Sequence, residues 1–176
     1  MTAILRYSTR PFPSSRLLPE IKPRPARSPR GHSASKPAAV VVEALSTDKW
    51  FENKTYLHGV DLYNYHYWWE SHEAWENLWK KGHQDKLVSE FLKGLIKTSA
   101  AFIKWRLKVP RGVKLHYQGA MGHLRKVCAE HPVYMGIDLL RHIERLERHF
   151  SLMMGVDVEK WPDPTVNYPA IELQRV

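Results

Sequence analysis

The sequence lacks the features that would place it in several large protein classes. It holds a single cysteine, Cys128, so no disulfide can form within the chain, and a reducing compartment fits this composition. No uninterrupted apolar run approaches the roughly 20 residues of a membrane-spanning helix. Phosphate-binding loops, paired-cysteine motifs, dinucleotide-binding glycine patterns and internal repeats are absent from the sequence. We therefore expect a soluble, cytoplasmic globular domain with no membrane partner.

Acidic residues are scarce at the N-terminus, and this scarcity explains most of the net charge of +9. Residues 1–40 carry eight Lys and Arg against one acidic residue, whereas the remaining 136 residues carry 19 basic and 17 acidic residues. The body of the chain therefore has no strong electrostatic footprint for a polyanion. We expect no specific nucleic-acid partner; a protein partner or a homo-oligomer fits the composition better.

Residues 1–47 contain seven of the twelve prolines, together with many Arg and Ser residues, and show no apolar periodicity. Such a segment buries too little surface to offset its ordering entropy, which predicts a mostly disordered leader. An organellar transit peptide is an open alternative, because the segment is basic and poor in acids. Aromatic residues follow the leader, and we expect residues 48–60 to pack on the domain while residues 1–35 stay mobile.

Four apolar stripes with helical spacing follow, over about residues 64–81, 85–107, 110–128 and 134–152. Asn64 after a turn at Gly59 resembles an N-cap, and Pro110 suits the first turn of a helix. The connections are short, which favours antiparallel neighbours. The fold prediction is all-α: an up-and-down antiparallel bundle of about four helices over residues 48–155, with extended N- and C-terminal segments, the latter at 156–176.

The second predicted helix has apolar residues over more than half of its circumference and should be the most buried. Its narrow polar stripe is basic and consists of Lys86, Lys93, Lys97 and Lys104. This stripe is either a solvated face or an anion-binding strip.

Chemistry is most plausible in the first predicted helix, where His72 and Glu76 stand four residues apart inside an aromatic arc of about 120°. This spacing lets two side chains share a divalent metal or act together in proton transfer. Glu73 and Asp61 are weaker candidate metal ligands, and His66, His116 and His123 are histidines that the sequence does not place. The structural alternative is a buried His72 that bonds a carboxylate or a Trp N–H.

Two functions are compatible with these observations. The first is a structural or protein-interaction module with a buried His/Glu/Trp cluster. The second is a metal-dependent or acid–base enzyme, hydrolase-like, that uses His72 and Glu76. An enzyme requires at least three polar groups that converge on an accessible cavity, which distinguishes the two.

The motif His-Glu-x-Trp-Glu-x-x-Trp at residues 72–79 resembles that of a helical family, the domain of unknown function numbered 309. The resemblance covers about residues 57–128. Further matches are Gly59, Asp61, Leu62, Asn64 and Glu70, then Gly94, Leu95, Ile96, Ala100, Ala101, Lys104 and Trp105, and finally Arg111, Gly112 and Leu115. The resemblance implies a helical bundle and no particular reaction.

This chain departs from the family pattern at two positions. His66 stands where the family usually has glycine, and Lys97 stands where it usually has glutamine. If position 97 lined a shared polar site, a lysine would change the charge of that site.

Overall fold

The computed structural model describes residues 5–16, 43–81 and 85–174. Within these ranges the chain forms five α-helices: α1 (Lys54–Asn64), α2 (Trp68–Lys81), α3 (Lys86–Arg106), α4 (Pro110–Glu130) and α5 (Leu139–Ser151). The only sheet in this part of the chain is a hairpin of β1 (Val133–Tyr134) and β2 (Ile137–Asp138), and two short 3-10 helices lie at Trp50–Glu52 and Val158–Lys160. The all-α prediction is confirmed.

Capping side chains explain where several helices begin. Asn53 accepts a hydrogen bond from the Tyr56 amide at the start of α1, and Asp85 accepts from Leu87 and Val88 at the start of α3. Asp138 does the same for α5 by accepting from Arg141. Pro110 occupies the first turn of α4, as predicted, because its missing N–H needs no partner there.

The helix predicted over residues 64–81 begins only at Trp68, as α2, and the helix α1 before it was not predicted. The prediction of Asn64 as an N-cap is wrong. Asn64 is the last residue of α1, and Gly59 lies within that helix rather than in a turn. The break occurs at His66, whose φ of 66° is left-handed. The Tyr67 amide donates to the Leu62 carbonyl at 2.8 Å and the His66 amide to the Tyr63 carbonyl at 3.0 Å, the pattern of a Schellman cap.

A glycine is favoured at the left-handed position of such a cap because it has no Cβ to clash. The backbone at His66 therefore gives a physical reason for the glycine that the resembled family usually carries at this position. The predicted start of the helix was too early because the apolar spacing of α2 continues smoothly through Tyr65.

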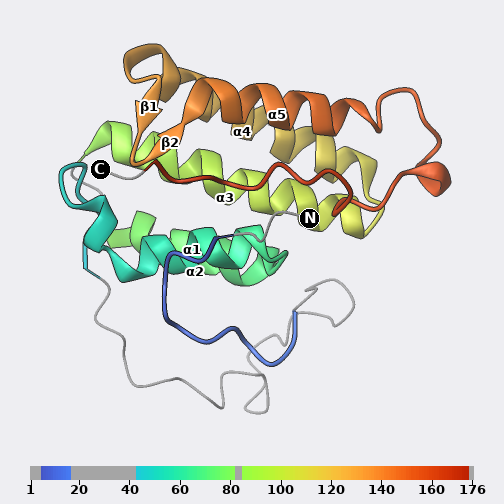
Figure 1. Cartoon of the computed structure of the whole chain (residues 1–176). Helices are drawn as coiled ribbons and strands as arrows, with labels where there is room; N and C mark the ends of the chain where they lie inside the picture. Colours follow the sequence, from blue (N-terminus) through green and yellow to red (C-terminus); the bar gives the residue numbers. More distant parts are fainter. Residues whose placement is uncertain (1–4, 17–42, 82–84, 175–176) are drawn as a thin grey trace.

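Helix α3 is central: it packs against α2 on one side and α4 on the other, while α1 packs on α2 and α5 lies beside α4 (Figure 1). Close approach depends on two glycines. A Cβ at Gly94 would lie 2.5 Å from the Leu124 side chain, and one at Gly59 would collide with the Trp75 indole. The core between these helices is aromatic, with Trp75, Trp105, Tyr56, Tyr63, Phe91 and Phe102 fully buried.

The segments flanking the helices also contact the bundle. Trp50 is buried, meets Tyr56 of α1 edge-on, and lies so close to Gly136 that a Cβ there would collide with its ring. Residues 5–16 bond to α1, so the expected mobility of residues 1–35 is wrong for this stretch. Residues 1–4 and 17–42 of the leader expected to be disordered lie outside the described residues. No helix in the described ranges has the length and apolarity to cross a membrane.

Candidate functional site

His72 and Glu76 open into a pocket between α2, α3 and α4, with a volume of about 410 Å³. We call it the histidine pocket. Its lining is His72, Glu76, Trp79, Lys93, Ile96, Lys97, Ala100, His116 and His123. The pocket is within the size range of small-molecule sites, and it combines an apolar wall with several converging polar groups. The predicted pair therefore does share one helix face, as its four-residue spacing requires.

The His72 ring is oriented by the neighbouring helix. Its Nδ1 lies 3.2 Å from the Ile96 carbonyl oxygen, and its ring stacks on Trp69 with an interplanar angle of 6°. A carbonyl oxygen only accepts, so Nδ1 carries the proton in this bond and Nε2 keeps a lone pair. The prediction of a carboxylate or Trp N–H partner is wrong, whereas His72 is mostly buried, as expected.

Burial lowers the pKa of His72, and this effect outweighs the Ile96 hydrogen bond and the Glu76 charge, which both raise it. The imidazole is therefore neutral at neutral pH. A neutral imidazole with a fixed tautomer and a free Nε2 lone pair is a proton acceptor or a hydrogen-bond acceptor for a bound molecule.

Glu76 faces the same pocket and pairs with Lys80 at 3.2 Å. Its side chain is 37% exposed, so this ion pair is well screened. Glu76 therefore contributes a solvated negative charge at one end of the pocket.

Two further histidines of the pocket lining, His116 and His123, come from α4, and no sequence pattern predicts their position. The Nδ1 atom of His116 is buried and has no hydrogen-bond partner among the described residues. Burial, and then the nearby Lys97 and Lys104, lower the pKa of His116. His116 therefore adds a second neutral imidazole to the pocket lining.

His123 is held by Glu90, a residue that the sequence analysis missed. Its Nδ1 lies 2.9 Å from the Glu90 carboxylate, which also pairs with Lys93 at 3.4 Å and Lys126 at 3.2 Å. The hydrogen bond with His123 and the contact with Lys126 lower the pKa of Glu90 to about 2. The side chain of Glu90 is only 15% exposed, so this carboxylate anchors the rim of the pocket.

Lys97 lines the pocket together with Lys93, so these two residues of the basic stripe do more than face solvent. The aliphatic part of Lys97 crosses close to α4: a Cβ at Gly119 would lie 2.8 Å from its Cδ. The position where the resembled family usually has glutamine is therefore part of a polar site, and lysine adds a positive charge to it.

The other predicted metal ligands lie elsewhere. Glu73 is exposed on α2, and burial followed by the Glu76 charge raises its pKa. Asp61 is fully buried and accepts hydrogen bonds from the amides of Tyr7 and Ser8. Within residues 5–16, 43–81 and 85–174, no three His, Cys, Asp or Glu side chains are grouped closely enough to hold a metal ion.

Residues 56–115 match the family described as a domain of unknown function (DUF309). The matched segment includes the part of the pocket that α2 and α3 supply, whereas His116 and His123 of α4 lie beyond it. No curated protein and no solved structure matches the chain.

Proposed function

We propose that this helical domain, which matches the DUF309 family over residues 56–115, is a binding module for a small organic anion, which occupies the histidine pocket. The observation that carries the proposal is the convergence of three imidazoles and two lysine ammonium groups on one pocket. This meets the criterion of at least three convergent polar groups at an accessible cavity.

The charge of the lining sets the sign of the ligand. Lys93 and Lys97 are cationic, and Glu76 is the only acidic side chain among the lining residues that the structure describes. Because Glu76 already pairs with Lys80, its charge is partly neutralised. Lys93 is likewise already paired, with Glu90 at 3.4 Å, so a carboxylate or phosphate group has its most favourable partner in Lys97.

The apolar wall sets the shape of the ligand. Trp79, Ile96 and Ala100 line one part of the pocket, and the Trp79 indole nitrogen is held by the Ser89 hydroxyl at 2.9 Å. An aromatic or branched aliphatic body fits against these side chains, with its anionic group directed toward Lys97. His72 Nε2 is placed to accept a hydrogen bond or a proton from the bound molecule.

Titration of the full chain with benzoate tests this proposal, by calorimetry and by the histidine ring signals in NMR. We expect saturable binding at one site, which Lys97→Gln weakens by about fivefold to tenfold through loss of a charged partner. Lys86→Gln is the matched control, because Lys86 is exposed on the same basic stripe and does not line the pocket. Absence of saturable binding, or equal effects of the two substitutions, contradicts the proposal.

Acid–base catalysis is the second candidate, and the fixed tautomer of His72 favours it. In that function Nε2 removes a proton from the bound molecule, so activity requires His72 to be neutral. The pKa of His72 is lowered, so a rate that depends on it falls only below the ordinary titration range of a histidine. His72→Gln should leave benzoate affinity within about threefold while removing that pH dependence.

The interaction module is the competing proposal, in which the domain presents a surface to a protein partner or to a second copy. An interaction module does not need a ligand in the histidine pocket, so the absence of anion binding would support this proposal. The metal-dependent version of the enzyme has a separate test. If the enzyme is metal-dependent, elemental analysis should find stoichiometric metal in the unaltered purified protein and none in His72→Ala.

A further inference from the structure

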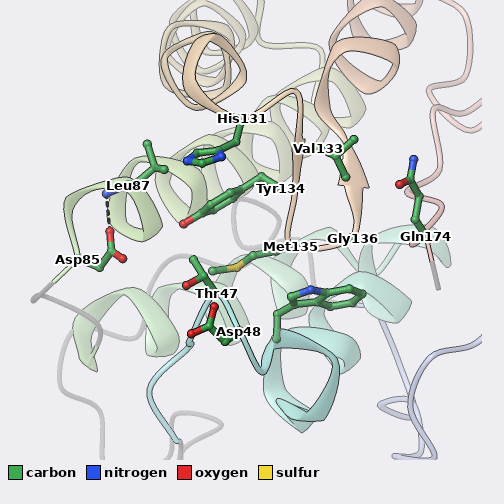
Figure 2. A pocket seen from close by; sticks show the side chains of 11 residues that line it. Thr47, Asp48, Asp85, Leu87, His131, Val133, Tyr134, Met135, Gly136 and Gln174 are labelled. Atoms are coloured by element: carbon green, nitrogen blue, oxygen red, sulfur yellow. Dashed lines mark hydrogen bonds between the residues drawn. The ribbon is translucent and has the colours of Figure 1, made fainter. Parts of the chain in front are cut away.

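A second pocket, at the other end of α3, has the opposite chemical character. Its volume is about 690 Å³, and it lies between the start of α3, the β1–β2 hairpin and the residues that precede the first 3-10 helix (Figure 2). We call it the Tyr134 pocket. The charged side chains of the described lining are Asp48 and Asp85, and no Lys or Arg is among them.

The hairpin forms a rigid wall of this pocket. Met135 and Gly136 have φ values of 46° and 77°, as in the tight two-residue turns that join antiparallel strands. A side chain at Gly136 would collide with the Trp50 ring, and the Tyr56 hydroxyl donates to the Met135 carbonyl at 2.8 Å. Tyr134 is therefore presented from a preformed turn.

The Tyr134 side chain carries the second observation. Only 6% of the Tyr134 surface is exposed, and the Tyr134 hydroxyl has no hydrogen-bond partner among the described residues. The Phe91 ring packs edge-on against Tyr134 with ring centroids 5.1 Å apart, and the His131 ring packs against it at 5.6 Å with a tilt of 33°. These two contacts fix the Tyr134 ring. Figure 2 shows the hydroxyl directed into the space beside Asp85 and Thr47. An unpaired buried hydroxyl is costly, so it marks a place for a ligand atom.

The surroundings of this hydroxyl are negative. Burial raises the pKa of Tyr134, and the charges of Asp85 and Glu130 raise it further, so the phenol stays protonated. Asp85 uses one carboxylate oxygen to cap α3, accepting from Leu87 at 2.8 Å, and its other oxygen is not part of that cap. Asp48 is exposed on the same side of the pocket (Figure 2).

We propose that the Tyr134 pocket binds an alkyl ammonium or alkyl guanidinium group, with the charged head between Asp85, Asp48 and the Tyr134 hydroxyl. The aliphatic stem lies along Trp50, Val133 and Leu87, which line the apolar part. Aromatic faces beside a cation add attraction to that of the carboxylates. This chemistry is found both in free polyamines and in the Arg and Lys side chains of peptides.

Calorimetric titration of the full chain with agmatine tests the proposal, with glutarate as an anionic probe of similar length. We expect saturable binding of one agmatine and no binding of glutarate at this site. Tyr134→Phe should weaken agmatine about tenfold, because it removes a hydrogen bond to a charged group. The same substitution should leave the thermal melt unchanged or raise it, since the lost hydroxyl has no described partner.

Three further variants test whether agmatine binds at the Tyr134 pocket. Asp48→Asn should weaken agmatine by about threefold, as expected for an exposed charge. Asp157→Asn is the matched control, an exposed aspartate outside the pocket, and His72→Gln tests independence from the histidine pocket. Both of these controls should bind agmatine like the unaltered chain.

A comparison of agmatine with acetyl-arginine amide then identifies the source of the cation. Tighter binding of agmatine points to a free polyamine, and tighter binding of the amide points to a peptide side chain; both outcomes support the cation site. The proposal is overturned if agmatine does not saturate, if glutarate binds equally well, or if Tyr134→Phe and Asp157→Asn bind alike.

Discussion

Two extended segments, residues 5–16 and residues 161–174, are both held by helix α1, but by different means. Asp61 and Asn64 stand three residues apart on this helix and are both fully buried. Asp61 binds the N-terminal segment, and Asn64 binds the C-terminal one. One helix face thus uses a charged acceptor for one end of the chain and a neutral amide for the other.

The charged attachment holds a segment that is largely exposed. The Asp61 carboxylate accepts from the Tyr7 amide at 2.7 Å and from the Ser8 amide and hydroxyl, each at 2.8 Å, and the Arg6 guanidinium lies 3.6 Å away. Phe12 stacks on Tyr67 at 5.1 Å, beyond these bonds. If this segment detached from α1, water could replace most of the hydrogen bonds that its backbone N–H groups make to Asp61.

The neutral attachment holds a segment that is part of the core. Asn64 donates to the Ile171 carbonyl at 2.8 Å and accepts from the Ile171 amide at 2.7 Å, and Ile171 is only 1% exposed. Trp105 donates to the Pro162 carbonyl at 2.9 Å, and Tyr168 packs among Tyr63 and Phe102. The comparison shows that the burial of the segment, rather than the charge of the acceptor, should decide how much each attachment stabilises the fold.

The largest effect is expected for Asn64→Ala. This substitution leaves the buried amide and carbonyl of Ile171 without partners, which should lower the free energy of unfolding by roughly 3 kcal/mol. Urea denaturation measures the loss. Asn77→Ala is the control, an exposed asparagine on α2 that should change stability by less than about 0.5 kcal/mol. Equal stabilities for the two variants would contradict the comparison.

Asp61→Asn should have a smaller effect, of about 1–2 kcal/mol. Its amide group can accept from one of the two backbone N–H groups, but its NH2 would face the other donor. The N-terminal segment should therefore detach more often, and trypsin should cut after Arg6 and Arg16 several times faster than in the unaltered chain. Unchanged cleavage rates would mean that Asp61 does not hold the segment.

Acid should weaken the N-terminal attachment through His58. Its Nδ1 lies 3.2 Å from the Ser8 hydroxyl, and burial, followed by the Arg10 charge, lowers the pKa of His58 to about 4. The unfolded chain therefore binds a proton that the folded chain does not between pH 6.5 and about 4. Stability should fall as the pH decreases through this window, by at most about 1.4 kcal/mol per pH unit for each such histidine.

Urea denaturation midpoints measured between pH 6.5 and about 4 test whether stability falls with decreasing pH. His58→Gln should make the dependence of stability on pH weaker. His142, beside the C-terminal segment in the structure, is fully buried with a pKa lowered to about 3 and should keep part of the slope in that variant. A stability that is constant from pH 7 to 4 would contradict both assignments.

The smallest effect concerns His66. Glycine there should relieve about 1 kcal/mol of left-handed backbone strain, but it loses the edge contact of the ring with Tyr168 at 4.7 Å. The relieved strain and the lost ring contact nearly cancel, so His66→Gly should leave the stability of the fold almost unchanged. His66→Ala loses the same contact and keeps the strain, so it should be about 1 kcal/mol less stable than His66→Gly in a thermal melt. Identical melts would show that the positive φ carries no cost.

Periodicity was sufficient to predict α3 and α4 within a few residues, because their apolar stripes are long and their starts are marked by Asp85 and Pro110. It failed at His66, where the left-handed turn has no sequence signal apart from the glycine usual in the resembled family. It also misread Asn64, because an asparagine that bonds a distant backbone looks the same in sequence as one that caps a helix.

The candidate site was predictable only within one helix. The spacing of His72 and Glu76 places them together without tertiary information, and both do line the pocket. The partnership of Glu90 with His123 depends on the register between α3 and α4, over a separation of 33 residues. Long-range register of this kind is set by side-chain packing, such as Gly94 against Leu124, which no local pattern encodes.

One hydrogen bond links the two extended segments directly: the Leu173 amide donates to the Tyr7 hydroxyl at 2.9 Å. This bond joins residues that are 166 positions apart in the chain, and both of the segments that it links are also attached to α1. A force applied between residues 7 and 173 would therefore load these few bonds first and open them one after another. The helices behind them would bear tension only after both ends had been pulled away from α1, so the domain should yield at low force along this axis.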